Sequence, residues 1–578
     1  MAAVAVGFAA ADAYVVVLAL PEMMASVDLN IDQLQRAAPI VSGFLLGYIA
    51  MLPLIGRIAD IRGRVPVLVG SLVVFSLGSL VTAAEYDLFS MVVGRFLQGV
   101  GGGGLVPATL ALVADIWVVE RRGLPLGVVG AVQELGSVIG PLYGAVVLRF
   151  STWQTIFWIN MAVALVLAAA LLVLARLVPG DGTGIREPSR GLPDVAGALI
   201  ALGATVALAL VLIEPVRLKS GITTGLAFIP YVGETRWSTP VALTLYVLVL
   251  AFVARELTAR RPLVDLRGLR DISTSADLPG AGLLGIALGG IVLAFATADP
   301  EVQVFSPLGP WFLLGSAVAA ALFGWRLRTA ATPLVPRGSL AERRAWGSVV
   351  VSFFVGAALI AALVDIPIFA RVTVYPDSQL GAALVLVRLL AALPVGALLG
   401  GYLIRRFQVG VLSAVGMLLA AGGFAWMASW ERTSLDQPTA TIPLVLCGFG
   451  FGLAIAPVNA ALLAATRTDV HGLASALLVV ARMVGMLVGI SALTTIGLRR
   501  FYAVSAQQPS IDEVCNSSRV CDEYVEILRD AGIAQLHAIF WGAAFCAVVA
   551  AVLSLVLLRG GSASTAKGVP VSTGNPGL

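Results

Sequence analysis

The sequence has little charge for its length. Only 12% of its 578 residues are Asp, Glu, Lys or Arg, whereas soluble domains carry about 25%. Hydrophobic residues make up 59% of the chain, and the mean hydropathy is +0.97. This composition excludes an ordinary soluble protein, and we interpret the chain as a polytopic membrane protein.

Histidine and cysteine are also scarce. The two histidines and four cysteines form no zinc-binding spacing, and no Gly-rich phosphate loop or Walker motif occurs. We therefore predict no metal site, no catalytic residues and no cofactor, which leaves a proton gradient as the expected energy source. The net charge of +4 comes from loop arginines rather than from a nucleic-acid patch.

Long apolar runs, by contrast, fill most of the chain. They are continuous for about 20 residues, the length of a membrane-crossing helix rather than of an alternating barrel strand. We count about sixteen spans, so the fold class is all-α. Loops on one side hold 23 Lys and Arg residues and loops on the other hold 11. The bias predicts that both termini are cytoplasmic, in a bacterial inner membrane.

The spans divide into three parts. Residues 1–177 and 341–558 each hold six spans, and 178–340 is a linker with two hairpins. The stretches 194–270 and 277–340 resemble each other, because each opens on Asp and ends in a Pro-Leu-Val loop. Residues 559–578 are expected to be a disordered cytoplasmic tail.

Four short stretches resemble signatures of the major facilitator superfamily. "GRIADIRGRV" (56–65) is similar to its gate-loop motif, at Gly56, Asp60, Gly63 and Arg64. "RFLQGVGGG" (95–103) resembles its Arg-x-x-Gln-Gly motif. "GSVIGPLYG" (136–144) resembles its antiporter motif, at Gly136, Gly140, Pro141 and Gly144. "DAYVVVLALP" (12–21) resembles the first span of the fourteen-helix drug:proton antiporters, although Tyr14 and Val17 depart from that pattern.

The resemblance implies two six-helix bundles with extra linker helices. Within the superfamily, "QELGSVIGPLYG" and "VVARMVGML" (479–487) look like the mycobacterial triacylglyceride exporters that work with a periplasmic lipoprotein. This resemblance implies outward movement of a lipid or large amphiphile, a periplasmic lipoprotein as partner, and a gate role for the loop at Asp60.

Two carboxylates lie deep inside spans. Glu134 is about 16 Å and Asp12 about 13 Å from the nearer end of its helix. A charge at that depth must face the bundle interior and have a partner. Each acid is therefore either a proton-coupling site or half of a static ion pair, and by resemblance Asp12 is the better candidate for coupling.

Three arginines within spans are the candidate partners. Arg95 lies at the depth of Asp12, and Arg482 is expected to join Asp12 and Glu134 in a central cluster. Arg388 is the alternative partner of Glu134. Asp365 lies about five residues from a helix end, so we expect it to be a solvated residue at the rim.

The other motif residues have more ordinary interpretations. Gly136, Gly140 and Gly144 share one helix face, which favours close helix packing, and Pro141 can bend the span. Asp60 and Arg64 are expected to be too exposed to bind a substrate and to form a gate latch instead.

The connector 498–534 is long for one between neighbouring membrane helices. Cys515 and Cys521 share it, and an oxidising periplasm predicts a disulfide between them. "DEYVEILRDAGI" (522–533) has helical spacing of apolar residues, so we expect an amphipathic helix that guides lipid or binds a carrier. A cap that only stabilises the fold is the alternative.

These observations favour a monomeric, proton-coupled lipid exporter that contacts membrane lipids and works by alternating access. A multidrug:proton antiporter is the alternative on the same scaffold. A membrane enzyme or a non-transporting scaffold would belong to another class, and the sequence contains no catalytic His-Asp pair to support an enzyme.

Overall fold

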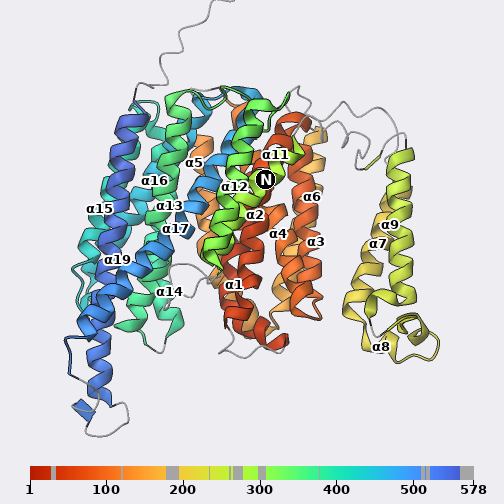
Figure 1. The fold of residues 1–578 in the computed structure, drawn as a ribbon, viewed down its shortest axis with the longest axis horizontal. Coiled ribbons are helices and arrows are strands. Elements are labelled where there is room, and N and C mark those ends of the chain that lie inside the picture. The colour runs from red at the N-terminus through yellow and green to blue at the C-terminus, as the bar shows by residue number, and fades with distance from the viewer. Residues whose placement is uncertain are drawn as a thin grey trace, which may run out of the picture. The chain divides into compact units, whose positions relative to one another are not determined.

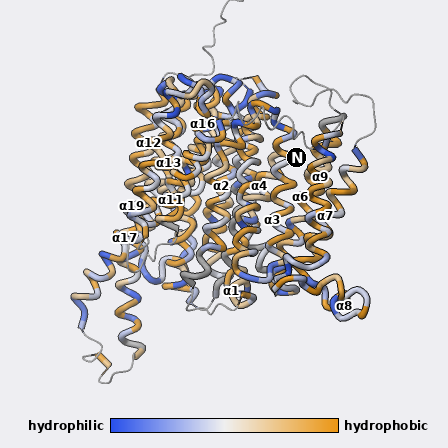
Figure 2. The backbone as a smooth tube through the Cα atoms, turned by 45° about the vertical axis from the view of Figure 1, so that its right-hand side comes forward, coloured by the Kyte–Doolittle hydropathy of each residue, from blue (hydrophilic) through white to orange (hydrophobic). Residues whose placement is uncertain are grey.

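The computed structural model describes most of the chain as helices (Figure 1). The described residues are 1–27, 34–118, 121–177, 194–233, 235–259, 262–263, 277–296, 308–376, 378–509, 514–515 and 521–559. These ranges contain no strand. In Figure 2 apolar residues run along the helices, as expected of segments that cross a membrane.

Sixteen helices of nineteen residues or more form the described structure. Their bounds are α1 Ala2–Ser26, α2 Leu34–Arg62, α3 Arg64–Ala83, α4 Leu88–Ile116, α5 Gly123–Phe150, α6 Gln154–Leu177, α7 Val195–Ile213, α9 Pro240–Thr258, α11 Leu278–Ala296, α12 Gly309–Thr329, α13 Arg343–Val372, α14 Gln379–Leu403, α15 Val409–Met427, α16 Thr441–Ala464, α17 His471–Ser505 and α19 Asp522–Leu557.

Thirteen of the described helices are long and apolar enough to cross a membrane, and three further ones hold shorter apolar stretches. The all-α polytopic fold predicted from the apolar runs is therefore confirmed. Short helices lie in the connectors: α8 Val216–Lys219, η3 Gly225–Phe228, η4 Arg236–Ser238, η5 Ser434–Asp436, η6 Pro438–Ala440 and η7 Thr468–Val470.

The chain forms two compact units. Unit 1 comprises Met1–Leu112, Gly136–Arg337 and Asp469–Val480, and unit 2 comprises Val113–Leu135, Gly338–Thr468 and Ala481–Leu578. Three long helices, α4, α5 and α17, therefore contribute one part to each unit. One further boundary falls within the short helix η7, and the boundary after Arg337 falls in the connector between α12 and α13.

In unit 1, α3 packs on α6, and the hairpin of α11 and α12 packs on α2. A second hairpin, α7 with α9, touches the end of α3. Leu212 at the end of α7 is buried with Val81 and Ala84 there. This apolar contact fixes one end of the second hairpin to the helices that precede it.

In unit 2, α16 packs against α14 and α15, while α19 packs against α13 and α15. Aromatic side chains fill one part of its core. Phe369 of α13 contacts Trp430 and Phe540, and Phe540 stacks on Phe424 of α15. The rings join three helices and one loop into a single apolar cluster.

The two linker hairpins share one polar arrangement. Asp194 accepts a hydrogen bond from the backbone N–H of Gly197 at the start of α7 and pairs with Arg255 of α9, at 2.8 Å. In the same way, Asp277 accepts from the backbone N–H of Gly280 and pairs with Arg326 of α12, at 2.6 Å. Each arginine precedes its Pro-Leu-Val loop by seven residues. The first of these loops lies mostly outside the described residues.

Candidate functional site

A buried polar cluster in unit 1 is centred on Asp12 of α1, which is only 2% exposed. Its Oδ2 is 3.0 Å from NH1 of Arg95 on α4. Its Oδ1 accepts hydrogen bonds from Asn160 of α6 and from Gln98 of α4. Three neighbours thus satisfy both carboxylate oxygens away from water.

Arg95 is held as tightly as its partner. It is 1% exposed, donates to Gln98 Oε1 at 2.8 Å and to the Ile40 carbonyl at 3.4 Å. Its guanidinium also lies 4.6 Å from the centre of the Phe44 ring, in cation–π range. Arg95 therefore has other acceptors within reach when Asp12 is not charged.

The amides of Gln98 and Asn160 were not predicted as site residues. Gln98 stands in the quoted "RFLQGV" motif, and Asn160 is a lone amide in the apolar span of α6. An uncharged amide costs less to bury than a charge, so neither stands out from its helix alone. Their role becomes visible only when α1, α4 and α6 are brought together.

The glycines of the antiporter motif lie beside the same helix. A Cβ atom added to Gly136 would lie 1.9 Å from the carbonyl oxygen of Gly7, and one on Gly140 would lie 2.4 Å from that of Ala11. Only glycine therefore lets α5 contact the backbone of α1 next to Asp12. Gly144 lies on the same face of α5 and packs against Val15 of α1.

Among the described side chains, no other predicted partner joins the cluster around Asp12. The Glu134 and Pro141 side chains lie outside the described residues. Arg482 is 7% exposed in α17, with no hydrogen bond or ion pair to another described residue. Half-buried Arg388 donates to Thr441 Oγ1 at 3.3 Å. The cluster of Asp12, Glu134 and Arg482 stays a prediction.

Asp365 was expected to be solvated, and the structure shows it buried, at 7% exposure. It has no hydrogen-bond or ion-pair partner among the described residues. The helix α13 continues to Val372, and one turn beyond Asp365 the buried Phe369 packs against Trp430 and His537. These rings cover the helix where the sequence suggested an open rim.

The gate loop caps the start of α17 within unit 1. Asp60 accepts hydrogen bonds from the backbone N–H groups of Gly472 and Leu473, at 2.8 and 2.9 Å. Arg64 pairs with Asp60 at 2.6 Å. A carboxylate is favoured at a helix N-terminus by the unpaired N–H groups and the dipole. The loop was expected to be exposed, but the side chain of Asp60 is fully covered because α17 begins over it.

Two glycines make this cap possible. A Cβ atom on Gly472 would lie 2.4 Å from the Gly56 carbonyl oxygen, and one on Gly56 would lie 2.6 Å from that of Gly472. The backbones of α2 and α17 are thus in direct contact. Gly63 adopts a positive φ of 94° between α2 and α3, a conformation that favours glycine.

At the other end of α17, the helix continues to Ser505. Cys515 and Cys521 are joined by a disulfide, and α19 starts at the next residue, Asp522. The helix predicted at 522–533 is therefore the first part of α19. Residues 510–513 and 516–520 lie outside the described part of the chain.

An arginine from another connector holds the start of α19. Arg432, which follows α15, binds the carboxylate of Glu526 and lies 2.6 Å from Asp530. Glu526 also pairs with Arg529 at 2.6 Å. These exposed charges fix the beginning of α19 to unit 2.

Comparison with known proteins places this geometry in context. The family model described as Major Facilitator Superfamily matches residues 2–490. A triacylglyceride transporter of Mycolicibacterium hassiacum is 35% identical over 508 residues, covering 86% of this chain and 78% of that protein. Another, of Mycolicibacterium smegmatis, is 33% identical over 571 residues, covering 96% and 86%. The solved human organic anion transporter MFSD10 (TETRAN) shares the fold, with a TM-score of 0.55 at 13% identity over 96% of this chain and 97% of that one.

Proposed function

Because the chain belongs to the major facilitator superfamily, we propose that it moves a triacylglyceride-like lipid or another large amphiphile outward across a bacterial inner membrane. It is a membrane transporter rather than an enzyme. The names of the mycobacterial relatives support a lipid as the cargo. The protein would work as a monomer by alternating access. Both of its termini would lie in the cytoplasm.

The observation that carries the proposed mechanism is the buried cluster around Asp12. A proton can bind Asp12 only if the carboxylate loses its ion pair with Arg95, because a charged partner favours the ionised acid. Arg95 is already bonded to Gln98 Oε1 and the Ile40 carbonyl, which would retain it after protonation. In each cycle Asp12 would thus alternate between binding a proton and pairing with Arg95. Lipid export would in this way be coupled to proton entry.

The cap on α17 would act as the gate. Asp60 binds two backbone N–H groups of α17 in the conformation described, and these bonds must break if α17 moves away from α2. Each such charge-assisted bond contributes about 1.5–3 kcal/mol. The latch would hold one conformation until substrate or proton binding offsets that energy.

The start of α19 would serve lipid delivery. Tyr524, Val525 and Leu528 lie on this charged segment, which the disulfide and Arg432 hold in place. Such a surface could guide a departing lipid or bind a periplasmic lipoprotein carrier. A cap that only stabilises unit 2 remains the competing interpretation.

Transport into proteoliposomes tests the proposal. Purified full-length protein would be reconstituted with labelled triacylglyceride, and lipid exchange would be measured with and without an imposed pH gradient. We expect a gradient-dependent rate that Asp12→Asn abolishes. An equal rate without the gradient would rule out proton coupling. Gradient-driven transport of an organic cation such as ethidium, with no lipid transport, would instead favour the multidrug:proton antiporter.

A further inference from the structure

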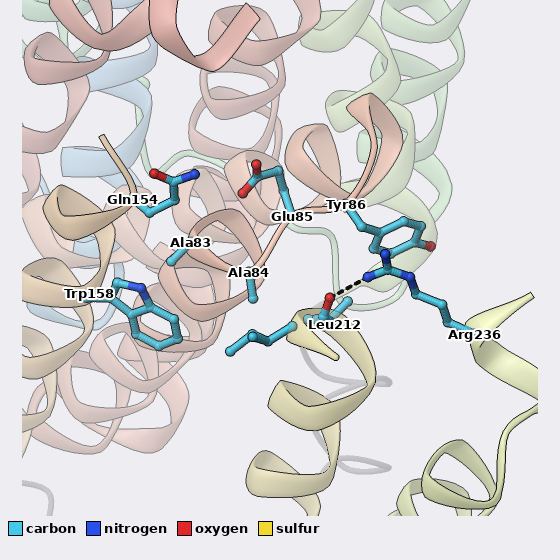
Figure 3. Close-up of a pocket in the computed structure, with 9 residues that line it drawn as sticks. Ala83, Ala84, Glu85, Tyr86, Gln154, Trp158, Leu212 and Arg236 are labelled. Carbon is cyan, nitrogen blue, oxygen red and sulfur yellow. Dashed lines mark hydrogen bonds between the residues drawn. The ribbon is translucent and has the colours of Figure 1, made fainter. Parts of the chain in front are cut away.

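A recess lies in unit 1 where the α7–α9 hairpin meets the helices before it (Figure 3). Its volume is about 300 Å³. The α3–α4 turn contributes Glu85 and Tyr86, the start of α6 contributes Gln154 and Trp158, and the hairpin contributes Leu212 and Arg236. The loop charges predict that these helix ends face outward, at the level of lipid headgroups.

Glu85 supplies an acid to this recess. Burial raises the pKa of Glu85 to about 7, and a hydrogen bond from Ser26 opposes that rise. The carboxylate is half-buried and has no ion pair among the described residues. A cationic ligand beside it would favour the ionised form. In the view of Figure 3, Glu85 lies between Gln154 and Tyr86.

Arg236 supplies a positive charge on the hairpin side of the recess, and its contacts hold it in place. Its NH1 donates to the Leu212 carbonyl at 2.7 Å, and its guanidinium lies 4.6 Å from the centre of the Tyr86 ring. The neighbouring Trp237 donates from its ring nitrogen to the Tyr86 hydroxyl at 2.9 Å. These contacts orient the guanidinium, whose Nε also lies 3.7 Å from Glu214 Oε2. Its remaining N–H groups point to a phosphate as the ligand, because arginine binds phosphate well.

The combination of charges selects the kind of ligand. A carboxylate and the indole of Trp158, which line the same recess, suit an ammonium group, and the arginine suits an anion. Ligand pockets span about 300–1,000 Å³, so this recess is sized for a headgroup rather than for a whole lipid. A triacylglyceride carries no charge and would leave the Glu85 carboxylate without a charged partner, so the recess does not match the proposed cargo.

We propose that this recess binds the headgroup of a zwitterionic aminophospholipid, with the ammonium at Glu85 and Trp158 and the phosphate at Arg236. The lipid comes from the surrounding bilayer and its acyl chains stay in the membrane. The bound headgroup fills the space between the hairpin and the α3–α4 turn. This inference goes beyond lipid export and does not depend on it.

Native mass spectrometry of the full-length protein tests the site. The protein would be released from bilayers that contain equal amounts of phosphatidylethanolamine, phosphatidylcholine and phosphatidylglycerol with the same acyl chains. We expect at least about tenfold preferential retention of one phosphatidylethanolamine, because choline cannot donate a hydrogen bond to Glu85 and glycerol carries no positive charge. Equal retention of the three lipids by the unmodified protein would overturn the proposal.

Two variants locate the preference. Glu85→Gln should reduce phosphatidylethanolamine retention to the level of phosphatidylglycerol. The control Glu431→Gln changes an exposed acid in a connector of unit 2 and should leave the preference intact. An undiminished preference in Glu85→Gln would also overturn the proposal. The comparison of the three lipids in the unmodified protein decides the question even if Glu85→Gln does not fold.

Discussion

Asp12 of α1 and Arg95 of α4 form an ion pair of 3.0 Å in which neither residue is more than 2% exposed. Such a pair is compatible with a static clamp and with a proton-coupling site. Removal of one charge cannot separate these roles, because the charge left behind is itself destabilising. Removal of both charges can separate them.

We therefore predict different outcomes for one and two substitutions. Asp12→Asn alone should lower the free energy of unfolding by about 3–5 kcal/mol, since the buried charge of Arg95 then has no opposite charge beside it, even though Gln98 and the Ile40 carbonyl still accept its hydrogen bonds. Asp12→Asn with Arg95→Gln should recover most of that loss. Thermal unfolding of purified protein measures both effects.

Transport by the same two variants decides the function of the pair. If Asp12 carries the proton, the double variant is stable but does not export lipid. Export at the unmodified rate by the stable double variant would identify the pair as a clamp. Glu134→Gln is expected to abolish export while leaving expression intact, and a failure to accumulate as folded protein would favour a clamp at that position.

Gly472→Ala should open the cap on α17. Its Cβ atom would lie 2.4 Å from the Gly56 carbonyl oxygen, so the start of α17 must move and the bonds of Asp60 must weaken. We expect hydrogen–deuterium exchange at the Leu473 amide to rise about tenfold or more, which corresponds to about 1.4 kcal/mol. Gly324→Ala in α12 is the control, because nothing lies within 4 Å of its added Cβ. Unchanged exchange in Gly472→Ala would contradict the latch.

Replacement of 505–531 by a short Gly/Ser linker should leave a folded protein that does not export lipid. The replacement removes Glu526 and Asp530, the partners of Arg432, but keeps the buried part of α19 from Ile533 onward. Unfolding and lipid export are both measured. Normal lipid export by the shortened protein would exclude the delivery role.

Arg432→Gln is a milder change to the same segment. Exposed ion pairs contribute about 0–1 kcal/mol each, so the unfolding temperature should change little. Hydrogen–deuterium exchange in 522–531 should rise, and high salt should cause a similar rise in the unmodified protein because it screens these charges. Equal exchange in the variant and in the unmodified protein at low salt would show that Arg432 does not hold α19.

Glu85 should make stability depend on pH near neutrality. Because burial raises its pKa to about 7, the protonated form is favoured in the folded protein relative to the unfolded chain. Its contribution is fully present below its usual pKa and is lost as the pH rises through about 7. The unfolding temperature should therefore fall between pH 6 and pH 8, and by less in Glu85→Gln. An identical fall in both proteins would assign the effect to other groups.

The helices could be predicted from the sequence because each carries its own signal. An apolar run of about 20 residues must form a helix in lipid, whatever surrounds it. For example, the apolar runs at 88–114 and 155–177 correspond to α4, Leu88–Ile116, and α6, Gln154–Leu177. A carboxylate such as Asp12 in an apolar run also signals its own burial.

Residue environments that depend on neighbouring helices could not be predicted in this way. Asp60 and Asp365 both lie near helix ends, where the sequence indicates contact with water. The start of α17 covers the first, and the second is buried near the Phe369 cluster. Gln98 and Asn160 were missed for the same reason, since each amide becomes informative only beside Asp12.

The ion pairs of the two linker hairpins bear on how the gene for such a chain can lengthen during evolution. Asp194 with Arg255, and Asp277 with Arg326, each satisfy a helix end and an arginine inside a single hairpin. Such a hairpin carries its own polar partners, so a copied segment needs no matching change elsewhere in the gene. An added hairpin that crossed the membrane twice would leave every later helix with its original sidedness. The linker is therefore a place where tandem duplication can lengthen a transporter while the helices before and after it stay unchanged.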